Sequence, residues 1–368
     1  MNTFIIAEAG ANHNRDFDIA KKLIDVATES GADAVKFQTY SSGTLYSKNT
    51  PDFAGYKNIN KLIKDIELPR EWQKDLKNYC DDVGIEFMST PFDEQAVDEL
   101  YELGIKRFKI AGFEATDPRF VKYVRSTKLP LIISLGIGAD PGYAYEIHKS
   151  ILREHGSDLD KVEAAQDDFG NPDDFKESLH KWYKENMPDI TYLHCNNAYP
   201  TPFEDINLGS FLQLKNLIQW NNVFCNSSVG LSDHTEGILI PPIAVAMGAQ
   251  VIEKHFTLDR RMKGPDHAFA IEPGELKDMV HNIRISEKIT NTKNESFTKS
   301  EARFRAGCRS VVTTRALLEG HVIQESDITT KRPFLENSIS AAEYYKIIGK
   351  TLDKDLEEDI ILEYSYLK

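Results

Sequence analysis

Eight short apolar segments, each followed by a segment with helical periodicity, constrain the fold of this chain more than any other feature. The segments are rich in Val, Ile and Phe, which favours strands, and the repeated strand–helix order is typical of a parallel sheet covered by helices. The expected strands are residues 4–9, 33–38, 85–90, 107–110, 130–134, 190–195, 227–233 and 250–256. The expected helices are residues 16–30, 70–83, 93–103, 118–127, 207–219, 237–247 and 273–290.

Two α/β folds have this pattern, and the sequence after the first expected strand distinguishes them. An open doubly wound sheet usually carries a GxGxxG fingerprint after its first strand. The corresponding stretch here, "AEAGANHN", has none. Eight strands within about 260 residues is the count of a (β/α)8 TIM barrel. We therefore expect a TIM barrel over residues 1–289.

The pattern changes after the barrel. Residues 290–302 ("TNTKNESFTKSE" and the residue after it) are polar and poor in large hydrophobic side chains, which is typical of a linker. Residues 303–368 contain short strand-like runs and turns, and they predict a small β-rich domain. Modules of this size are commonly binding or interaction domains.

Composition excludes several classes of protein. The 368 residues carry a formal net charge of −14, which argues against a nucleic-acid partner. No apolar run is long enough to span a membrane, and the start "MNTFIIAEAG" lacks the basic region of a signal peptide. The four cysteines are scattered without CxxC spacing, so we expect reduced thiols and a cytoplasmic location.

Polar side chains occur where each expected strand ends. Barrel active sites lie at the carboxyl ends of the strands, so these side chains are expected to share one rim. The strand-end residues are Glu8, Lys36, Gln38, Ser89, Thr90, Lys109, Ser134, His194, Asn197, Ser232, Asp233, His234, Glu253 and His255. A polar residue at one strand end is unremarkable, but the whole set indicates a catalytic rim.

His234 and His255 end two successive expected strands, 255 − 234 = 21 residues apart. Neighbouring strands of a barrel would bring the two imidazoles together, where they could hold one divalent metal. Two histidines with oxygen ligands suit Mn²⁺, Co²⁺ or Mg²⁺, and Zn²⁺ less well. A structural role for both histidines is the alternative.

Two lysines near strand ends indicate an anionic ligand. Lys36 and Lys109 follow apolar residues, and a buried lysine without a counter-charge is costly. With Ser134, Ser232 and Asn197 they predict a cradle for phosphate or carboxylate. Glu8 and Glu114 are candidate general acids or bases, although Glu8 could instead form a salt bridge to one of these lysines.

Several strings of this sequence resemble the sialic acid synthase family, in order and over nearly the whole chain. They are "IIAEAGANHN", "GADAVKFQTY", "STPFD", "KIAGFE", "LHCNNAYPTPFEDINL", "GLSDHTEG", "VIEKHFTLDRRMKGPD" and "GHVIQESDITTKRP". The resemblance implies an enzyme that condenses phosphoenolpyruvate with an N-acylated amino sugar to give a nonulosonic acid and phosphate. It also implies that residues 303–368 are an antifreeze-like SAF domain and that the protein is a domain-swapped homodimer.

The resemblance also implies a role for each matching residue. His234 and His255 match metal ligands, with Mn²⁺ expected first and Mg²⁺ or Co²⁺ as alternatives, and Glu8 and Glu114 match essential carboxylates. The phosphoenolpyruvate contacts would be Lys36, Thr90, Lys109, Ser134, Asn197 and Ser232. The acceptor sugar would contact Gln38, Tyr199, Asp266 and Arg332, the last of these offered across the dimer.

The sequence departs from the family at several points. Gly112 stands where many relatives have a serine, Leu135 replaces a threonine, and Phe334 follows the Arg-Pro pair where relatives have a glycine-bearing turn. The chain is also longer over residues 140–190. Its acidic stretch, 155–175, is either a solvated surface insertion or a lid over the rim.

These departures leave the acceptor open between N-acetylmannosamine, a diacetamido-trideoxy hexose and another hexosamine. Two other functions remain as alternatives. One is a metal-dependent barrel aldolase or epimerase acting on a sugar phosphate. The other is a catalytically silent family member that acts as a binding subunit.

Overall fold

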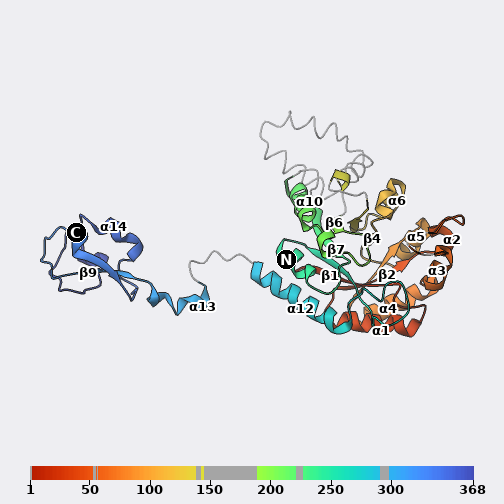
Figure 1. Cartoon of the computed structure of the whole chain (residues 1–368), viewed down its shortest axis with the longest axis horizontal. Coiled ribbons are helices and arrows are strands. Elements are labelled where there is room, and N and C mark those ends of the chain that lie inside the picture. The colour runs from red at the N-terminus through yellow and green to blue at the C-terminus, as the bar shows by residue number, and fades with distance from the viewer. Residues whose placement is uncertain are drawn as a thin grey trace, which may run out of the picture. The chain divides into compact units, whose positions relative to one another are not determined.

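The structure is a computed structural model that describes residues 2–52, 55, 57–137, 142–144, 189–220, 227–290 and 298–368. The chain forms two compact units, Met1–Asn291 and Thr292–Lys368, which are described separately below. Figure 1 shows the larger unit as a sheet surrounded by helices. The proposed insertion, residues 155–175, lies outside the described residues.

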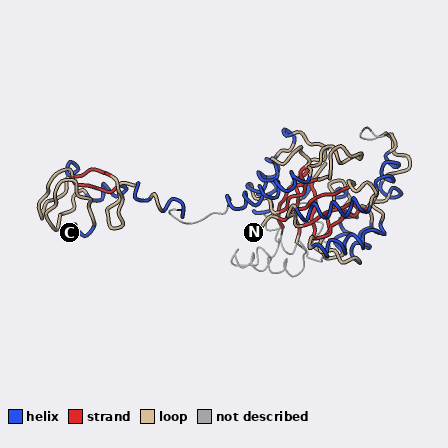
Figure 2. Tube along the Cα trace, turned by 90° about the horizontal axis from the view of Figure 1, so that it is seen from below, coloured by secondary structure: helices blue, strands red, loops and turns tan. Residues whose placement is uncertain are grey.

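The larger unit is built on eight parallel strands hydrogen-bonded in the order β3-β2-β1-β8-β7-β6-β5-β4. The two end strands of this order, β3 and β4, also contact each other, so the barrel is nearly closed. Figure 2 shows the strands at the centre of the larger unit with helices around them. This confirms the predicted TIM-like fold. The strands are β1 (Phe4–Gly10), β2 (Ala34–Thr39), β3 (Glu86–Pro91), β4 (Phe108–Ile110), β5 (Leu131–Leu135), β6 (Ile190–Cys195), β7 (Ser227–Asp233) and β8 (Val251–His255).

Helices cover the outside of the sheet, and their ends follow local sequence signals. Asp16, Asp93 and Asp117 cap the amino ends of three of them through bonds to backbone N–H groups, as short acceptor side chains do at this position. Gly84 ends another helix with a φ of 81°. The covering helices are α1 (Phe17–Glu29), α4 (Gln73–Val83), α5 (Glu94–Glu102), α6 (Pro118–Ser126), α10 (Leu208–Trp220), α11 (Ile240–Ala246) and α12 (Pro273–Thr290). Among the described residues, no helix has the length and apolar character needed to cross a bilayer.

A two-helix segment after β2 was not expected from the sequence. It comprises α2 (Ser42–Leu45) and α3 (Ile59–Ile66). Ile59 and Ile63 of α3 are buried against Tyr40, and Leu62 and Ile66 pack on the same cluster. This cluster is separate from the main core between sheet and helices.

The interior of the barrel is layered. A layer of apolar side chains fills its amino-terminal half. It consists of Phe4, Ile6, Ala34, Met88, Ile132, Leu193 and Val251. Successive inward positions on a strand are two residues apart. In most strands the next inward residue beyond this apolar layer is polar. Glu8 follows Ile6 in this way, and Ser134 follows Ile132. The strand sequences thus place an apolar layer beneath a polar layer, which forms the floor of the cavity described below.

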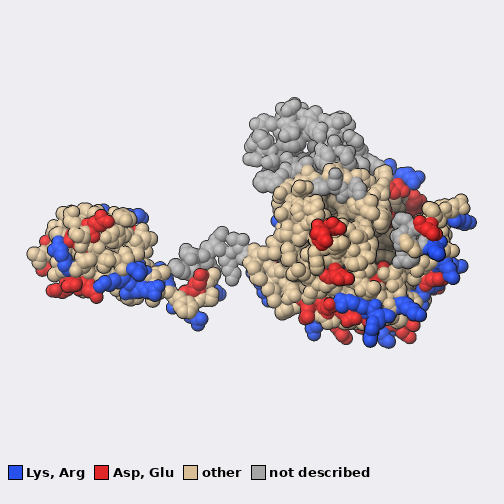
Figure 3. All heavy atoms as spheres, viewed as in Figure 1, with Lys and Arg blue, Asp and Glu red and all other residues tan. Residues whose placement is uncertain are grey.

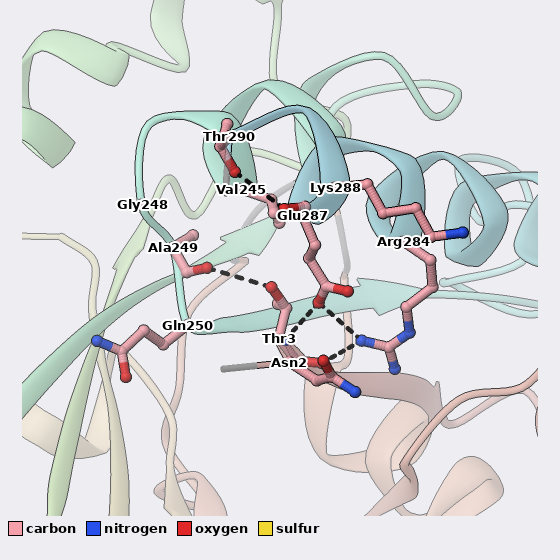
Figure 4. Close-up of a pocket in the computed structure, with 10 residues that line it drawn as sticks. All are labelled: Asn2, Thr3, Val245, Gly248, Ala249, Gln250, Arg284, Glu287, Lys288 and Thr290. Atoms are coloured by element: carbon pink, nitrogen blue, oxygen red, sulfur yellow. Dashed lines mark hydrogen bonds and ion pairs between the residues drawn. The ribbon is translucent and has the colours of Figure 1, made fainter. Parts of the chain in front are cut away.

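The opposite, amino-terminal face of the barrel has a hollow whose charged groups largely satisfy one another (Figure 4). Arg284 pairs with Glu287 at 2.9 Å and with Asp33 at 3.0 Å, and it donates to the Thr3 carbonyl at 2.7 Å. Glu287 also accepts a bond from the Thr3 amide. These contacts tie α12 to the first strands, as is typical of the stabilising face of a barrel.

The smaller unit has its own apolar core around Val311, Ile323 and Leu352. Its antiparallel pair is β9 (Ser310–Thr313) and β10 (Ile328–Lys331), and isolated bridges extend the β structure. Two short helices accompany them, α13 (Lys299–Ala302) and α14 (Tyr344–Ile347). The first lies within the stretch predicted as a linker, where Thr298 and Glu301 form a capping box.

Candidate active site

One cavity of about 460 Å³ opens at the carboxyl ends of the barrel strands. All of the predicted site residues except Glu114 and Arg332 line it. They are Glu8, Lys36, Gln38, Thr90, Lys109, Ser134, Asn197, Tyr199, Ser232, His234, His255 and Asp266. Side chains from all eight strands or their following loops therefore meet in one place.

Three strand-end residues of the expected rim face elsewhere. Ser89 is bonded to Thr39 at 2.7 Å, and His194 Nε2 lies 2.7 Å from the Ile206 carbonyl. Asp233 pairs with Lys254. Each is next in sequence to an inward-facing residue. Because successive side chains of a strand point to opposite faces, each of the three points away from the cavity.

Buried charges balance one another on the cavity floor. Lys36 Nζ lies 2.7 Å from Glu8 and 3.6 Å from Glu253, and Lys109 Nζ lies 3.2 Å from Glu253. The salt bridge considered for Glu8 is therefore present. Burial raises the pKa of Glu8 to about 7 against the opposing pull of Lys36. Burial also opposes ionisation of Glu253, but Lys109 and Lys36 outweigh it and hold the pKa at about 2.

Hydroxyl groups beside the lysines complete an anion cradle. Thr90 Oγ1 accepts a bond from Lys36 at 2.9 Å, and Ser232 donates to Glu253 at 2.9 Å. Ser134 Oγ is buried and has no hydrogen-bond partner among the described residues. A buried polar atom without a partner is costly, so this hydroxyl is available to a ligand.

The two histidines meet on one side of the cavity, where their ring centroids are 5.3 Å apart. His234 Nδ1 donates to the Asn196 carbonyl at 2.6 Å, which leaves Nε2 as a free acceptor. His255 Nδ1 is buried without a partner among the described residues. Burial lowers the pKa of His234 to about 4 and that of His255 well below its usual value, so both rings are neutral at pH 7.

This pair fits a divalent cation as part of a larger ligand set. The two rings are neighbours, and His234 Nε2 and His255 Nδ1 are nitrogen atoms available to a ligand. Within the described ranges, no group of three or more His, Cys, Asp or Glu side chains is arranged to hold a metal. A cation held here would therefore need further ligands from substrate or water, which suits a catalytic site with open positions.

Glu114 follows the cavity-lining residues Gly112 and Phe113 but does not itself line the cavity. Its Oε2 atom is buried and has no hydrogen-bond partner among the described residues. Burial raises the pKa of Glu114 to about 7, opposed by its own backbone N–H and by Lys109. A carboxyl group with this pKa can exchange protons near neutrality.

The mouth of the cavity has one aromatic side and one apolar side. The Tyr199 ring lies 4.2 Å from that of His234 and 5.5 Å from that of Phe269. Opposite the polar floor, α2 and α3 supply an apolar wall that consists of Leu45, Tyr46, Ile59, Leu62, Ile63 and Ile66. This wall was not predicted from the sequence, although Ile59, Leu62, Ile63 and Ile66 have helical spacing after the capping residue Asn58.

Asp266 reaches the cavity because the first loop of the barrel leaves room for it. Its Oδ2 atom accepts a bond from the Ala11 amide at 3.3 Å. A Cβ atom at Gly10 would lie 2.9 Å from that oxygen, and Gly10 also has a φ of 50°. Both features favour glycine at this position.

The departure at Gly112 has a steric explanation. Asn197 Oδ1, which accepts a bond from the Ile137 amide at 3.0 Å, lies over two glycines. A Cβ atom would approach it to 3.1 Å at Gly112 and to 1.7 Å at Gly136. A larger residue at position 112 would crowd Asn197. Leu135, the second departure, is buried in the main core.

The remaining predicted sugar contact, Arg332, belongs to the smaller unit. Its side chain is exposed and pairs with none of the described residues. Phe334, the third departure, packs within the same unit, where the Arg305 guanidinium lies 5.1 Å from its ring. The smaller unit therefore presents Arg332 without an internal partner.

Comparison with known proteins identifies the family of this chain. Residues 23–295 match the NeuB family and residues 309–367 match the SAF domain. The chain is 37% identical to N,N'-diacetyllegionaminic acid synthase of Legionella pneumophila, over 100% of this chain and 95% of the relative. It is 31% identical to a pseudaminic acid synthase of Campylobacter jejuni, over 96% of this chain and 93% of the relative.

A solved structure gives the same result. The N-acetylneuraminic acid (sialic acid) synthetase of Leptospira borgpetersenii is similar with a TM-score of 0.64 at 29% identity, over 83% of this chain and 90% of that chain. The relatives are nonulosonic acid synthases, which confirms the resemblance drawn from the sequence. The chain therefore belongs to the NeuB family, with a SAF domain after its barrel.

Proposed function

We propose that this protein condenses phosphoenolpyruvate with an N-acylated amino sugar to form a nonulosonic acid and inorganic phosphate. The observation that carries the proposal is the joint placement of two buried lysines and two neutral histidines in one cavity. The lysines suit a small polyanion, and the histidines suit a cation beside a carbonyl group. The names of the relatives support the same reaction class.

In this proposal the floor binds phosphoenolpyruvate. Lys36 and Lys109 bind its phosphate and carboxylate, with hydroxyl or amide contacts from Thr90, Ser134, Asn197 and Ser232. Glu8 and Glu253 neutralise the lysines before the substrate enters. The unpaired Ser134 hydroxyl then gains a partner when the anion binds.

The acceptor sugar binds above the floor, toward the mouth. Gln38, Tyr199 and Asp266 contact its polar groups, and the wall from α2 and α3 packs against its apolar ones. Methyl groups of N-acyl substituents or of a 6-deoxy carbon fit such a wall. We therefore favour a diacetamido-trideoxy hexose over N-acetylmannosamine as the acceptor.

The reaction forms one carbon–carbon bond. The C3 carbon of phosphoenolpyruvate attacks the aldehyde carbon of the open-chain sugar. The aldehyde oxygen takes a proton that Glu114, next to the cavity-lining Phe113, would supply through a water molecule. Water then adds at C2 and gives one proton to Glu8. The C2–O bond to phosphate breaks as the new hydroxyl becomes the keto oxygen, and the remaining proton leaves with the phosphate. A divalent cation held by His234 and His255, Mn²⁺ in our proposal, would polarise the aldehyde when bound.

The smaller unit completes the sugar site in a domain-swapped dimer. The exposed and unpaired Arg332 of one chain would then contact the N-acyl group bound by its partner. An arginine suits this role because its guanidinium donates several hydrogen bonds in a fixed geometry.

Phosphate release tests the proposal. The full chain is incubated with phosphoenolpyruvate, Mn²⁺ and one N-acyl amino sugar at a time, with and without a chelator. We expect release that requires both a sugar and the cation, and that is fastest with a diacetamido-trideoxy hexose. Protein that binds Mn²⁺ but releases no phosphate with any sugar would contradict the proposal and favour a silent binding subunit.

A further inference from the structure

A buried ion pair lies directly behind the two histidines. Asp233 and Lys254 precede His234 and His255 in the chain, and their Cα atoms are register partners in the pairing of β7 with β8. Their side chains are 0% and 1% exposed, and the Lys254 Nζ atom lies 2.7 Å from Asp233 Oδ2. The preceding register pair, Ser232 and Glu253, faces the cavity, so this pair faces outward.

The ion pair also clamps the backbone on both sides of His234. Asp233 Oδ1 accepts bonds from the Thr235 amide at 3.0 Å and from its hydroxyl at 2.8 Å. Lys254 Nζ donates to the Thr235 carbonyl as well. Residues 233 and 235 are thus joined to each other and to the residue before His255.

Further contacts hold the histidines between these anchors. The His234 carbonyl accepts from the Thr201 amide at 2.9 Å, and its ring donates to the Asn196 carbonyl at 2.6 Å. The His255 carbonyl accepts from the Ile271 amide at 3.1 Å. Asp233–Lys254 is one of two side-chain links between the two histidine-bearing strand ends; the other, Ser232–Glu253, lies on the cavity side.

Stability alone does not account for a charged pair at this place. Two charges removed from water lose hydration, and an apolar pair of similar volume often stabilises a protein as well or better. A charged, hydrogen-bonded pair has defined geometry, whereas apolar side chains can repack. The defined geometry of this ion pair would fix the positions of the two adjacent imidazoles.

We propose that Asp233 and Lys254 are positioning residues that set the relative placement of His234 and His255 for a divalent cation. The inference rests on the proposed function, because it requires that these histidines hold the cation. It assigns no direct contact with cation or substrate to either residue. It predicts that removing the pair weakens cation binding even where the chain remains folded.

The test measures Mn²⁺ binding to the full chain from the loss of the free-ion electron paramagnetic resonance signal. The main variant, D233N/K254M, removes both charges and so leaves no single charge buried without a partner. D233N alone keeps the side-chain volume and an acceptor oxygen for Thr235, and it serves if the double variant does not fold. R284M is the control, because it removes two ion pairs at the other face of the barrel.

We expect the Mn²⁺ Kd of D233N/K254M to rise about 10–100-fold, as for other residues that orient metal ligands. D233N should show a smaller rise, and R284M should lower the melting temperature without changing the Kd. A D233N/K254M Kd equal to that of the wild type would overturn the inference. H234A and H255A separate the two proposals: if either binds Mn²⁺ as the wild type does, the metal assignment itself fails.

Discussion

At the scale of single residues, the site combines buried cations with buried carboxylates of different protonation tendency. Glu253 stays ionised beside Lys109 and Lys36, whereas burial brings the pKa values of Glu8 and Glu114 to about 7. Two carboxyl groups near neutrality can serve as proton donor and acceptor in one cycle. The third carboxylate, Glu253, neutralises Lys36 and Lys109.

The first prediction concerns the protonation of Glu114. Its raised pKa means that the neutral acid is present below about pH 7 and is lost as the pH rises through that value. If Glu114 protonates the aldehyde oxygen, kcat should fall as the pH rises through about 7. Glu114→Gln should lower kcat about 100-fold and abolish this limb of the pH–rate profile. Persistence of the limb in the variant would assign it to another group, such as Glu8.

The second prediction concerns Lys109, whose Nζ faces Glu253 in the cavity floor. Lys109→Met keeps the length of the side chain but removes the charge that would bind phosphoenolpyruvate. A hydrogen bond to a charged group contributes about 1.5–3 kcal/mol, so the KM for phosphoenolpyruvate should rise about 10–100-fold. The KM for the sugar should change little. Lys106→Met, at an exposed position just before the same strand, is the control.

The sequence predicted these residues because strand alternation is a local property. Lys36, Lys109 and His255 stand at inward positions, and their strands were recognisable from apolar runs alone. The same alternation was not used to separate Ser89, His194 and Asp233 from their inward neighbours, so these three were wrongly expected on the rim. The pairing of Asp233 with Lys254 depends on the register of two strands, which no single segment contains.

At the scale of secondary-structure elements, α3 determines the shape of the sugar side of the cavity. Its apolar residues at positions 59, 62, 63 and 66 cover the rim rather than the outside of the sheet. Their helical spacing was present in the sequence, but a helix between a strand and its covering helix α4 is an insertion in the strand–helix repeat. Because α3 is not part of the strand–helix repeat, the repeat did not predict it.

The third prediction tests this wall. Ile63→Ala removes buried methyl groups that would contact the sugar, so the sugar KM should rise about tenfold, as expected for loss of 1–3 kcal/mol in an apolar pocket. The KM for phosphoenolpyruvate should be unaffected, because its proposed ligands lie on the floor. Lys61→Ala, on the exposed side of the same helix, should change neither constant. Equal rises in both KM values for Ile63→Ala would argue against a sugar-specific wall.

At the scale of the whole molecule, the charge of −14 coexists with a cavity that we propose binds an anion. Figure 3 shows acidic and basic side chains interspersed on the visible face of the larger unit. The charge that matters to the substrate is local, because Lys36 and Lys109 are buried where water screens them little. A negative net charge therefore does not argue against an anionic substrate.

The fourth prediction concerns the smaller unit. Removal of residues 303–368 or the substitution Arg332→Ala should weaken sugar binding more than phosphoenolpyruvate binding, because only the sugar is proposed to contact Arg332. For Arg332→Ala we expect a rise of about tenfold or more in the sugar KM, from loss of a hydrogen bond to a charged group. Steady-state kinetics with each substrate varied in turn measures both constants. Equal loss for the two substrates would contradict this division of roles.

The measurement that tests the central claim most directly follows the carbon–carbon bond itself. The full chain is supplied with phosphoenolpyruvate labelled with ¹³C at C3, a diacetamido-trideoxy hexose and Mn²⁺, and the reaction is observed by ¹³C NMR. We predict that the label moves from the vinyl carbon to the C3 methylene of a nonulosonic acid as phosphate is released. Label that ends in the methyl group of pyruvate, with the sugar unchanged, would show hydrolysis without condensation and would contradict the proposed reaction.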